Sequence, residues 1–117
     1  MCGFVGCFGK IDERLNVAGQ LINHRGPDEQ KYLEGNDWSL QFNRLSIIDL
    51  SKEAMQPFSF DGVDVYVNGE IYNYVELREK YKKEFHFKTS SDVEIIPFLY
   101  KKFGIKFLNY LNGMFSM

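Results

Sequence analysis

Apolar residues change their spacing along the chain, and the changes predict a strand followed by a helix at the amino-terminal end. The run FVGCF at residues 4–8 is short, rich in β-forming residues and flanked by glycines, which is typical of a buried strand. Apolar residues then recur at helical spacing over residues 12–22, and Asp12 is a suitable N-cap. The sequence HRGPD at residues 24–28 favours the end of this helix, with Gly26 at the C′ position.

Two turn signals predict pairs of extended segments in the middle of the chain. Residues 35–37 (GND) separate the first pair, and we expect its second segment to run on through the β-branched residues Ile47 and Ile48. Asp61 and Gly62 separate the second pair, in which valines alternate with polar residues. This pattern predicts a β-hairpin with a type I′ turn.

Two further helices are predicted in the second half of the chain. A capping-box pattern at Asn73 opens the first, and Ser91 with Glu94 three residues later opens the second, which should end at Gly104. Pro97 lies inside the second pattern and should kink that helix or delay its start. A strand, a helix, several antiparallel strands and then helices indicate an α+β fold rather than a regular βαβ alternation.

Composition and charge exclude some classes of function. The 117 residues suffice for one small domain, and a net charge of −2 with mixed acids and bases does not suggest a partner made of nucleic acid or anionic membrane. No apolar run is long enough to span a bilayer. The only cysteines, Cys2 and Cys7, should point to opposite faces of one strand, so we expect reduced thiols and a cytoplasmic protein.

Cys2 is a candidate nucleophile. Removal of Met1 would leave a residue with both a thiol and a free α-amine, and such an amine titrates at about pH 8. The amine could then act as the base that a nucleophile needs. A cysteine that merely happens to be second is the alternative, because thiols are inert without an activating environment.

Three other segments carry candidate binding groups, and each also has a purely structural explanation. Asn68 and Gly69 lie where a strand should give way to a turn and a helix; they could form an oxyanion hole, or a simple Asn-Gly turn. Arg44, at the entry of an apolar strand, could bind a carboxylate or lie solvated at an edge. Asp92, in the first turn of a helix, could bind an ammonium group or simply complement the helix dipole.

We expect no metal site and no nucleotide site in these residues. The only histidines, His24 and His86, have no metal-ligand spacing to the cysteines. The sequence has no glycine-rich phosphate loop of the Walker or Rossmann type.

Five motifs in this order resemble the glutaminase domain of class II glutamine amidotransferases: MCGFVG, HRGPD, RLSIIDLS, NGEIYNY and SSDVEII. They are most similar to the glutamine-hydrolysing asparagine synthetase family. RLSIIDLS followed by Gln56 and Pro57 favours this branch over the sugar-phosphate and purine-pathway enzymes. The resemblance implies the α+β fold of the N-terminal-nucleophile hydrolases, a four-layer αββα sandwich of two antiparallel sheets between helices.

The resemblance also implies the chemistry of the site. Cys2 would attack the side-chain amide of glutamine, and its own α-amine would shuttle the proton. Asn68 and the N–H of Gly69 would hold the tetrahedral oxyanion until ammonia leaves and water releases glutamate. Arg25 and Asp28 of HRGPD are expected to be supporting structure near the site.

The same resemblance assigns the residues that bind glutamine. Arg44 would hold its carboxylate, and Glu70 and Asp92 would receive its α-ammonium group. The backbone around Ile47 and Ile48 would line the pocket.

The resemblance covers residues 1–117, which we expect to be a glutaminase domain truncated at its C-terminal side. The family's synthetase domain, which would bind ATP and magnesium and amidate aspartate with the ammonia, is expected to lie outside this chain. We expect this chain to need no cofactor, to bind glutamine and that synthetase domain, and to be inactive while it keeps Met1. An exposed sheet edge and aromatic face would favour association, for example as a homodimer.

Two alternatives stay open. An amidotransferase of the same branch could deliver ammonia to another acceptor, as in the synthesis of surface polysaccharides. A non-catalytic glutamine-binding or interaction module could also keep this fold. Loss of Cys2, Arg44, Asn68 or Asp92 would favour the module, and all four residues are present.

Overall fold

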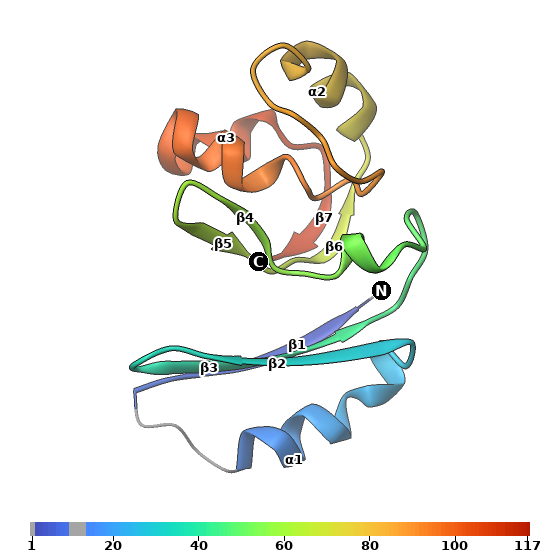
Figure 1. The fold of residues 1–117 in the computed structure, drawn as a ribbon, viewed down its shortest axis with the longest axis vertical. Coiled ribbons are helices and arrows are strands. Elements are labelled where there is room, and N and C mark those ends of the chain that lie inside the picture. The colour runs from blue at the N-terminus through green and yellow to red at the C-terminus, as the bar shows by residue number, and fades with distance from the viewer. Residues whose placement is uncertain (1, 10–13) are drawn as a thin grey trace. The chain divides into compact units, whose positions relative to one another are not determined.

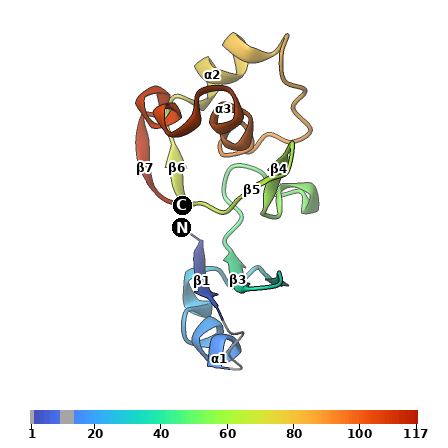
Figure 2. The same ribbon diagram turned by 90° about the vertical axis from the view of Figure 1, so that its left-hand side faces the viewer.

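A three-stranded antiparallel sheet with one helix makes up the first of two compact units, Met1–Ser46 and Ile47–Met117, in a computed structural model that describes residues 2–9 and 14–117. The elements of this unit are β1 (Gly3–Phe8), α1 (Arg14–Leu21), a 3-10 turn (Asn23–Arg25), β2 (Glu29–Glu34) and β3 (Trp38–Arg44). The strand order is β1-β3-β2, and both outer strands run antiparallel to β3. Helix α1 packs against one face of this sheet (Figures 1 and 2).

The face of β3 toward α1 is polar. Ser39, Gln41 and Asn43 alternate along the strand, and all three are buried. Asn43 Nδ2 donates to the carbonyl oxygen of Gly19 in α1 (2.8 Å), and Gln41 Nε2 donates to Asn43 Oδ1 (3.2 Å). Only Leu15 and Gly19 of α1 are buried. Side-chain hydrogen bonds therefore join α1 to this sheet alongside apolar packing.

The structure refines three expectations for the first strand and helix. The strand at FVGCF is confirmed as β1, but it is an edge strand and only half-buried, with Phe8 91% exposed. Helix α1 ends at Leu21, and Gly26 has a φ of −153°, so the expected left-handed C′ conformation is wrong. Gly26 is needed for another reason: a Cβ there would lie 2.1 Å from the carbonyl oxygen of Asn43. The expected N-cap, Asp12, lies outside the described residues.

The first turn is confirmed, but the strand behind it is shorter than expected. At residues 35–37 the chain joins β2 to β3, and the Gly35 N–H donates to the carbonyl oxygen of Trp38 (2.8 Å). Strand β3 ends at Arg44, so the expectation that it continues through Ile47 and Ile48 is wrong. It stops because the next two backbone N–H groups donate to side chains instead of to a neighbouring strand.

Two small antiparallel ribbons and two helices form the second unit. Its elements are a 3-10 turn (Lys52–Ala54), β4 (Phe58–Phe60), β5 (Val63–Val65), β6 (Asn68–Ile71), α2 (Tyr74–Tyr81), α3 (Ile96–Phe103), a 3-10 helix (Gly104–Tyr110) and β7 (Gly113–Ser116). Strand β4 pairs with β5, and β6 pairs with β7, which lies far along the chain (Figure 2). The hairpin turn at Asp61 and Gly62 is confirmed: both residues have positive φ, 47° and 77°, as a type I′ turn requires.

The predicted start of α2 is confirmed, but the capping box is wrong. Helix α2 begins directly after Asn73, whose side chain makes no capping hydrogen bond. Asn73 Nδ2 instead donates to the carbonyl oxygen of Tyr110 (2.9 Å), and its Oδ1 accepts from the N–H of Asn112 (2.8 Å). The side chain therefore fastens the segment that leads into β7.

Helix α3 starts later than the Ser91 and Glu94 pattern predicts. It runs from Ile96, with Pro97 in its first turn, where a missing N–H has no helical partner to lose. Of the two outcomes predicted for Pro97, a kink or a delayed start, the structure has the second. The helix ends where predicted, before Gly104, which has a φ of 57°.

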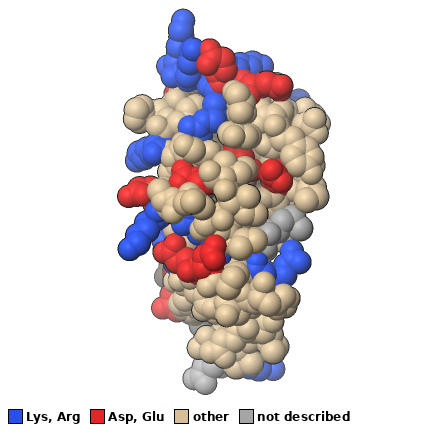
Figure 3. Space-filling model, turned by 90° about the vertical axis from the view of Figure 1, so that its right-hand side faces the viewer, with Lys and Arg blue, Asp and Glu red and all other residues tan. Residues whose placement is uncertain are grey.

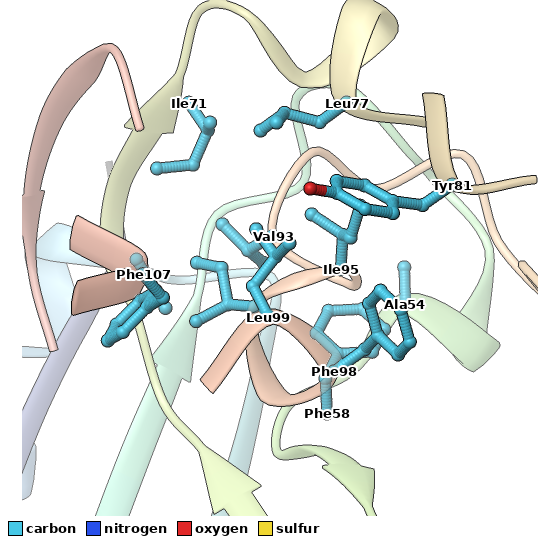
Figure 4. Close-up of a cluster of buried hydrophobic side chains, with 12 residues drawn as sticks. Ala54, Phe58, Ile71, Leu77, Tyr81, Val93, Ile95, Phe98, Leu99 and Phe107 are labelled. Atoms are coloured by element: carbon cyan, nitrogen blue, oxygen red, sulfur yellow. The ribbon is translucent and has the colours of Figure 1, made fainter. Parts of the chain in front are cut away.

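The hydrophobic core of the second unit lies between its two helices and its strands (Figure 4). Leu77 and Tyr81 from α2 meet Phe98 and Leu99 from α3, and Ile71 closes the cluster from β6. The remaining buried members of the cluster are Ala54, Phe58, Val67, Val93, Ile95, Ile96 and Phe107. This core holds β6 and the segment before α3 in fixed positions relative to each other.

Helices and strands are mixed in both units, which confirms the α+β class. In the part of the chain that the structure describes, no helix is both long enough and apolar enough to cross a membrane. On the face shown in Figure 3, basic and acidic side chains of the described residues lie side by side and form no patch of a single sign.

Candidate active site

Cys2 and Arg44 lie together at one end of the sheet of the first unit. The antiparallel register pairs Gly3 with Asn43, so Cys2 stands opposite Arg44 one step further along. Residues opposite each other in an antiparallel pair share a face of the sheet. The Leu45 N–H donates to Cys2 Sγ (3.3 Å), and Sγ lies 3.6 Å from the Leu45 carbonyl oxygen. Cys2 and Cys7 are not joined by a disulfide bond.

Arg44 is the last residue of β3, so the expectation that it stands at the entry of an apolar strand is wrong. It is also buried, at 5% exposure, and its guanidinium group lies 3.3 Å from the carboxylate of Glu29 on β2. Asp28 fixes the chain around it: the Asp28 N–H donates to the carbonyl oxygen of Arg44 (3.1 Å), and Asp28 Oδ2 accepts from the Ser46 N–H (2.8 Å). Asp28 of HRGPD thus supports the turn that follows Arg44.

Strand β6 carries the second group of predicted site residues on an unpaired edge. Asn68, Gly69 and Glu70 lie within the strand, not at the expected junction between strand and helix. The Tyr72 N–H donates to the carbonyl oxygen of Asn112, the residue before β7 (2.7 Å). The Ile71 N–H donates instead to Asp92. Because N–H directions alternate along a strand, the Gly69 N–H points to the same side as that of Ile71, away from β7.

Side chains accept hydrogen bonds from the backbone N–H groups two residues before and two residues after Gly69. The Val67 N–H donates to Gln56 Oε1 (2.6 Å), and Gln56 Nε2 donates back to the Val67 carbonyl oxygen (3.0 Å). The Ile71 N–H donates to Asp92 Oδ2 (2.8 Å). Between them stands the Gly69 N–H, for which no acceptor is found among the residues that the structure describes. An N–H in this position can bind an anionic or carbonyl oxygen.

Asn68 adds an unsatisfied polar atom to this edge. Its Oδ1 is buried and has no hydrogen-bond partner in the described part of the chain. Buried polar atoms are nearly always hydrogen-bonded, so one without a partner calls for an explanation, and a bound ligand is one. The side-chain amide is able both to donate and to accept.

Asp92 brings a buried carboxylate to the same edge of β6. Burial raises its pKa above the ordinary value of 3.8, and the nearby charge of Glu70 raises the pKa further, while the hydrogen bond from Ile71 opposes the shift. A buried carboxylate with a raised pKa gains from a cation placed beside it. Asp92 therefore suits an ammonium group better than a neutral partner.

Ile47 and Ile48 begin the second unit in a segment without regular structure, and the side chain of Ile47 is 65% exposed. The segment is tied to the loop that carries Asp92, because Asp49 Oδ2 accepts from the Ser90 N–H (2.6 Å). Among the described residues, no group of three or more His, Cys, Asp or Glu side chains is placed to hold a metal ion.

The residues that the sequence patterns missed are those that hold the candidate groups in place: Gln56, Glu29, Asp49, Arg78 and Glu94. Each acts through contacts with residues distant in sequence or through backbone groups. Glu94 gave a local signal, which pointed to a helix cap, and Gln56 was noted only as a mark of the asparagine synthetase branch.

Comparison with known proteins defines the class. Over residues 1–117 the chain matches the family described as the glutamine amidotransferase domain. The chain therefore belongs to the glutamine amidotransferase domain family, which confirms the resemblance of its motifs.

Its relatives include glutamine-hydrolysing asparagine synthetases from several kingdoms. The chain is 39% identical to asparagine synthetase [glutamine-hydrolyzing] 1 of Bacillus subtilis, over 99% of this chain and 20% of that protein. It is 37% identical to asparagine synthetase [glutamine-hydrolyzing] 1 of Arabidopsis thaliana, over 99% of this chain and 21% of that protein. It is also 39% identical to the amidase chry2 of Gibberella zeae, over 92% of this chain and 16% of that protein. The chain thus spans about a fifth of the length of these relatives.

Proposed function

We propose that this chain is the glutamine-hydrolysing part of a glutamine-dependent asparagine synthetase, with Cys2 as the nucleophile after Met1 is removed. The family match over residues 1–117 supports the reaction class. The main structural support for the site is the edge of β6. There the Gly69 N–H lies between the N–H groups of Val67 and Ile71, both of which donate to side chains.

The proposed reaction begins at the thiol. Sγ of Cys2 attacks the side-chain amide carbon of glutamine while the free α-amine of Cys2 takes the thiol proton and passes it to the leaving nitrogen. The C–N bond breaks, ammonia leaves, and a γ-glutamyl thioester remains on Sγ. Water then attacks the thioester, which releases glutamate and restores the thiol. A chain that keeps Met1 lacks the amine and should be inactive.

Asn68 and Gly69 are proposed to stabilise the tetrahedral oxyanion. The backbone N–H of Gly69 and the side-chain Nδ2 donor of Asn68 lie on adjacent residues of β6. Donors that are already oriented toward the developing charge are worth the most, because they need no reorganisation during the reaction.

The amino-acid end of glutamine is proposed to bind to charged groups of opposite sign. Arg44 would take the carboxylate with its guanidinium fork, and Asp92 with Glu70 would take the α-ammonium group. The raised pKa of Asp92 supports this role, because a cation relieves the cost of the buried charge. The backbone around Ile47 and Ile48 would line the same pocket.

The ammonia would be used by a synthetase region that follows the glutaminase domain, as the length of the relatives suggests. That region would bind ATP and magnesium and amidate aspartate, and no residue of this chain is assigned to them. We further propose that the glutaminase part adopts the four-layer αββα sandwich of the N-terminal-nucleophile hydrolases, with residues 1–117 as its amino-terminal portion.

An amidotransferase with another ammonia acceptor is the second candidate. The observation in its favour is the relative from Gibberella zeae, which is named an amidase and is as similar to this chain as the Bacillus subtilis synthetase. The glutaminase half-reaction would be the same in both cases.

A glutaminase assay tests the proposal. The purified protein with Cys2 at its amino terminus should release glutamate and ammonia from glutamine in equal amounts. Cys2→Ala should abolish the release, and a variant with one extra residue before Cys2 should do so without disturbing the fold. Glutamine binding without turnover in the unblocked protein would instead support a non-catalytic binding module. Addition of aspartate and ATP to a protein that includes the synthetase region then tells the two acceptor candidates apart, because only an asparagine synthetase would form asparagine.

A further inference from the structure

The loop before Asp92 is held by side chains along its whole length. The Lys88 N–H donates to Glu94 Oε1 (2.7 Å), and the Thr89 N–H and hydroxyl group both donate to Glu94 Oε2 (3.0 and 2.8 Å). The Ser90 N–H donates to Asp49 (2.6 Å), and the Ser91 N–H donates to Thr89 Oγ1 (3.2 Å). Four consecutive backbone amides thus have side-chain acceptors.

Arg78 of α2 completes this arrangement from the other side. Its Nη2 donates to the carbonyl oxygen of Thr89 (2.5 Å), and its Nη1 donates to that of Ser91 (3.1 Å). Nη1 also lies 3.6 Å from Glu94 Oε2, and the guanidinium group stacks 4.1 Å above the ring of Phe87. One rigid fork therefore fixes two carbonyl groups and one carboxylate at the same time.

The contacts of Glu94 hold the loop at residues 88–91 and do not join it to the hydrophobic core. The hydrogen bonds and ion pairs of Glu94 all go to Lys88, Thr89 and Arg78, although Glu94 is only 5% exposed. A buried ion pair is weak evidence for stability, because apolar residues of similar volume often stabilise as well or better. Hydrogen bonds to fixed backbone groups do, however, specify one conformation.

The residue directly after this loop is Asp92, whose carboxylate must face the open edge of β6. We propose that Arg78 and Glu94 are positioning residues that fix Asp92 for the α-ammonium group of glutamine. This inference rests on the proposed function, in which Asp92 binds that group. Arg78 and Glu94 do not touch the substrate; they act through the backbone of residues 88–91.

The test compares glutamine hydrolysis by wild type, Arg78→Lys and Glu94→Gln, all with Cys2 at the amino terminus. Arg78→Lys keeps the charge but loses the fork, and Glu94→Gln keeps the shape but loses the charge and one acceptor. Both should raise KM for glutamine about tenfold and leave kcat within about twofold, because the ammonium group is remote from the reacting amide and binds equally in ground and transition states.

A matched control separates positioning from general destabilisation. Leu77→Val changes the neighbouring residue of α2, which packs in the core and makes none of the loop contacts. It should lower the melting temperature and leave KM unchanged. If KM rises in Leu77→Val as much as in Arg78→Lys, Arg78 has no specific positioning role.

A double-mutant cycle with Asp92→Asn gives the sharpest outcome. If Arg78 acts through Asp92, Arg78→Lys should raise KM in the wild-type background and change it less than about twofold in the Asp92→Asn background. Equal effects of Arg78→Lys in both backgrounds would overturn the inference. A wild-type protein that hydrolyses no glutamine would refute the proposed function, and the positioning role with it, before any variant is compared.

Discussion

Gly69→Ala should disrupt the pairing of β6 with β7 and the proposed oxyanion site in one step. An added Cβ at Gly69 would lie 2.3 Å from the carbonyl oxygen of Met114, 2.5 Å from Cα of Phe115 and 2.7 Å from its Cβ. The first two are backbone atoms, so no side chain can rotate away to relieve the clash. The two strands would have to separate by about 1 Å to reach ordinary contact distance.

The magnitude follows from this geometry. Overpacking of a closely packed site costs about 1–3 kcal/mol. The separation also weakens the ladder that pairs Asn68 with Ser116 and Glu70 with Met114, at about 1 kcal/mol for each hydrogen bond lost. The free energy of unfolding should therefore fall by about 2–4 kcal/mol, a large part of the stability of a chain this small.

Urea unfolding followed by circular dichroism measures the loss, and Gly6→Ala is the control. A Cβ at Gly6, in the edge strand β1, meets its nearest neighbour, the carbonyl oxygen of Ser39, at 3.4 Å, so this variant should unfold within about 0.5 kcal/mol of wild type. Glutamine hydrolysis by Gly69→Ala should fall about 100-fold in kcat, as for the loss of one oxyanion donor. A Gly69→Ala protein with wild-type stability and wild-type kcat would refute the reasoning.

Asp92 and Gln56 give two further predictions. Because burial raises the pKa of Asp92 above 3.8, its stabilising contribution is complete below about pH 4 and is lost as the pH rises through the folded-state value. The free energy of unfolding of wild type minus that of Asp92→Asn, from urea titrations, should therefore fall as the pH rises from about 4 through the folded-state pKa of Asp92; a difference that rises with pH would contradict the burial argument. Gln56→Leu leaves the N–H and carbonyl groups of Val67 buried without partners and should cost about 2–6 kcal/mol. Gln20→Leu, at an exposed position of α1, is the control and should change the free energy of unfolding by less than about 0.5 kcal/mol in the same titration. Equal effects of the two glutamine variants would count against a role for the Gln56 amide.

Local chemistry was enough to predict both turns and the end of α3. Asp61 and Gly62 need no information beyond their own backbone preferences, and the delayed start of α3 at Pro97 follows from a missing N–H. These features depend on residues within one turn of each other, which a sequence displays directly.

Two of the wrong expectations share a physical cause: a polar side chain that was expected to cap its own helix binds other backbone groups instead. Asn73 was expected to cap its own helix and instead holds residues 110–112. Glu94 was expected to cap a helix at Ser91 and instead accepts from residues 88 and 89. Such polar side chains have several partners of similar energy, and the tertiary fold selects among them.

In the candidate site, the chemical groups could be predicted from the sequence, but the residues that support them could not. The motifs that carry the resemblance contain Cys2, Arg44, Asn68, Gly69 and Asp92, so the sequence supplies the chemical groups. It does not supply their supports, because Gln56 and Arg78 act on backbone atoms 11 or more positions away. The direction of the Gly69 N–H likewise depends on which strand pairs with β6, and β7 lies more than 40 residues further along the chain.

The central claim is that Cys2 is an amino-terminal nucleophile in a glutamine site, and intact-mass analysis after treatment with a glutamine-mimicking diazoketone tests it most directly. The account predicts a protein that lacks Met1 and gains one adduct, which peptide mapping places on Cys2. Cys2→Ser should gain none, while Cys7→Ser should react like wild type. A folded protein that has lost Met1 and stays unlabelled, or that carries the adduct on Cys7, would contradict the account.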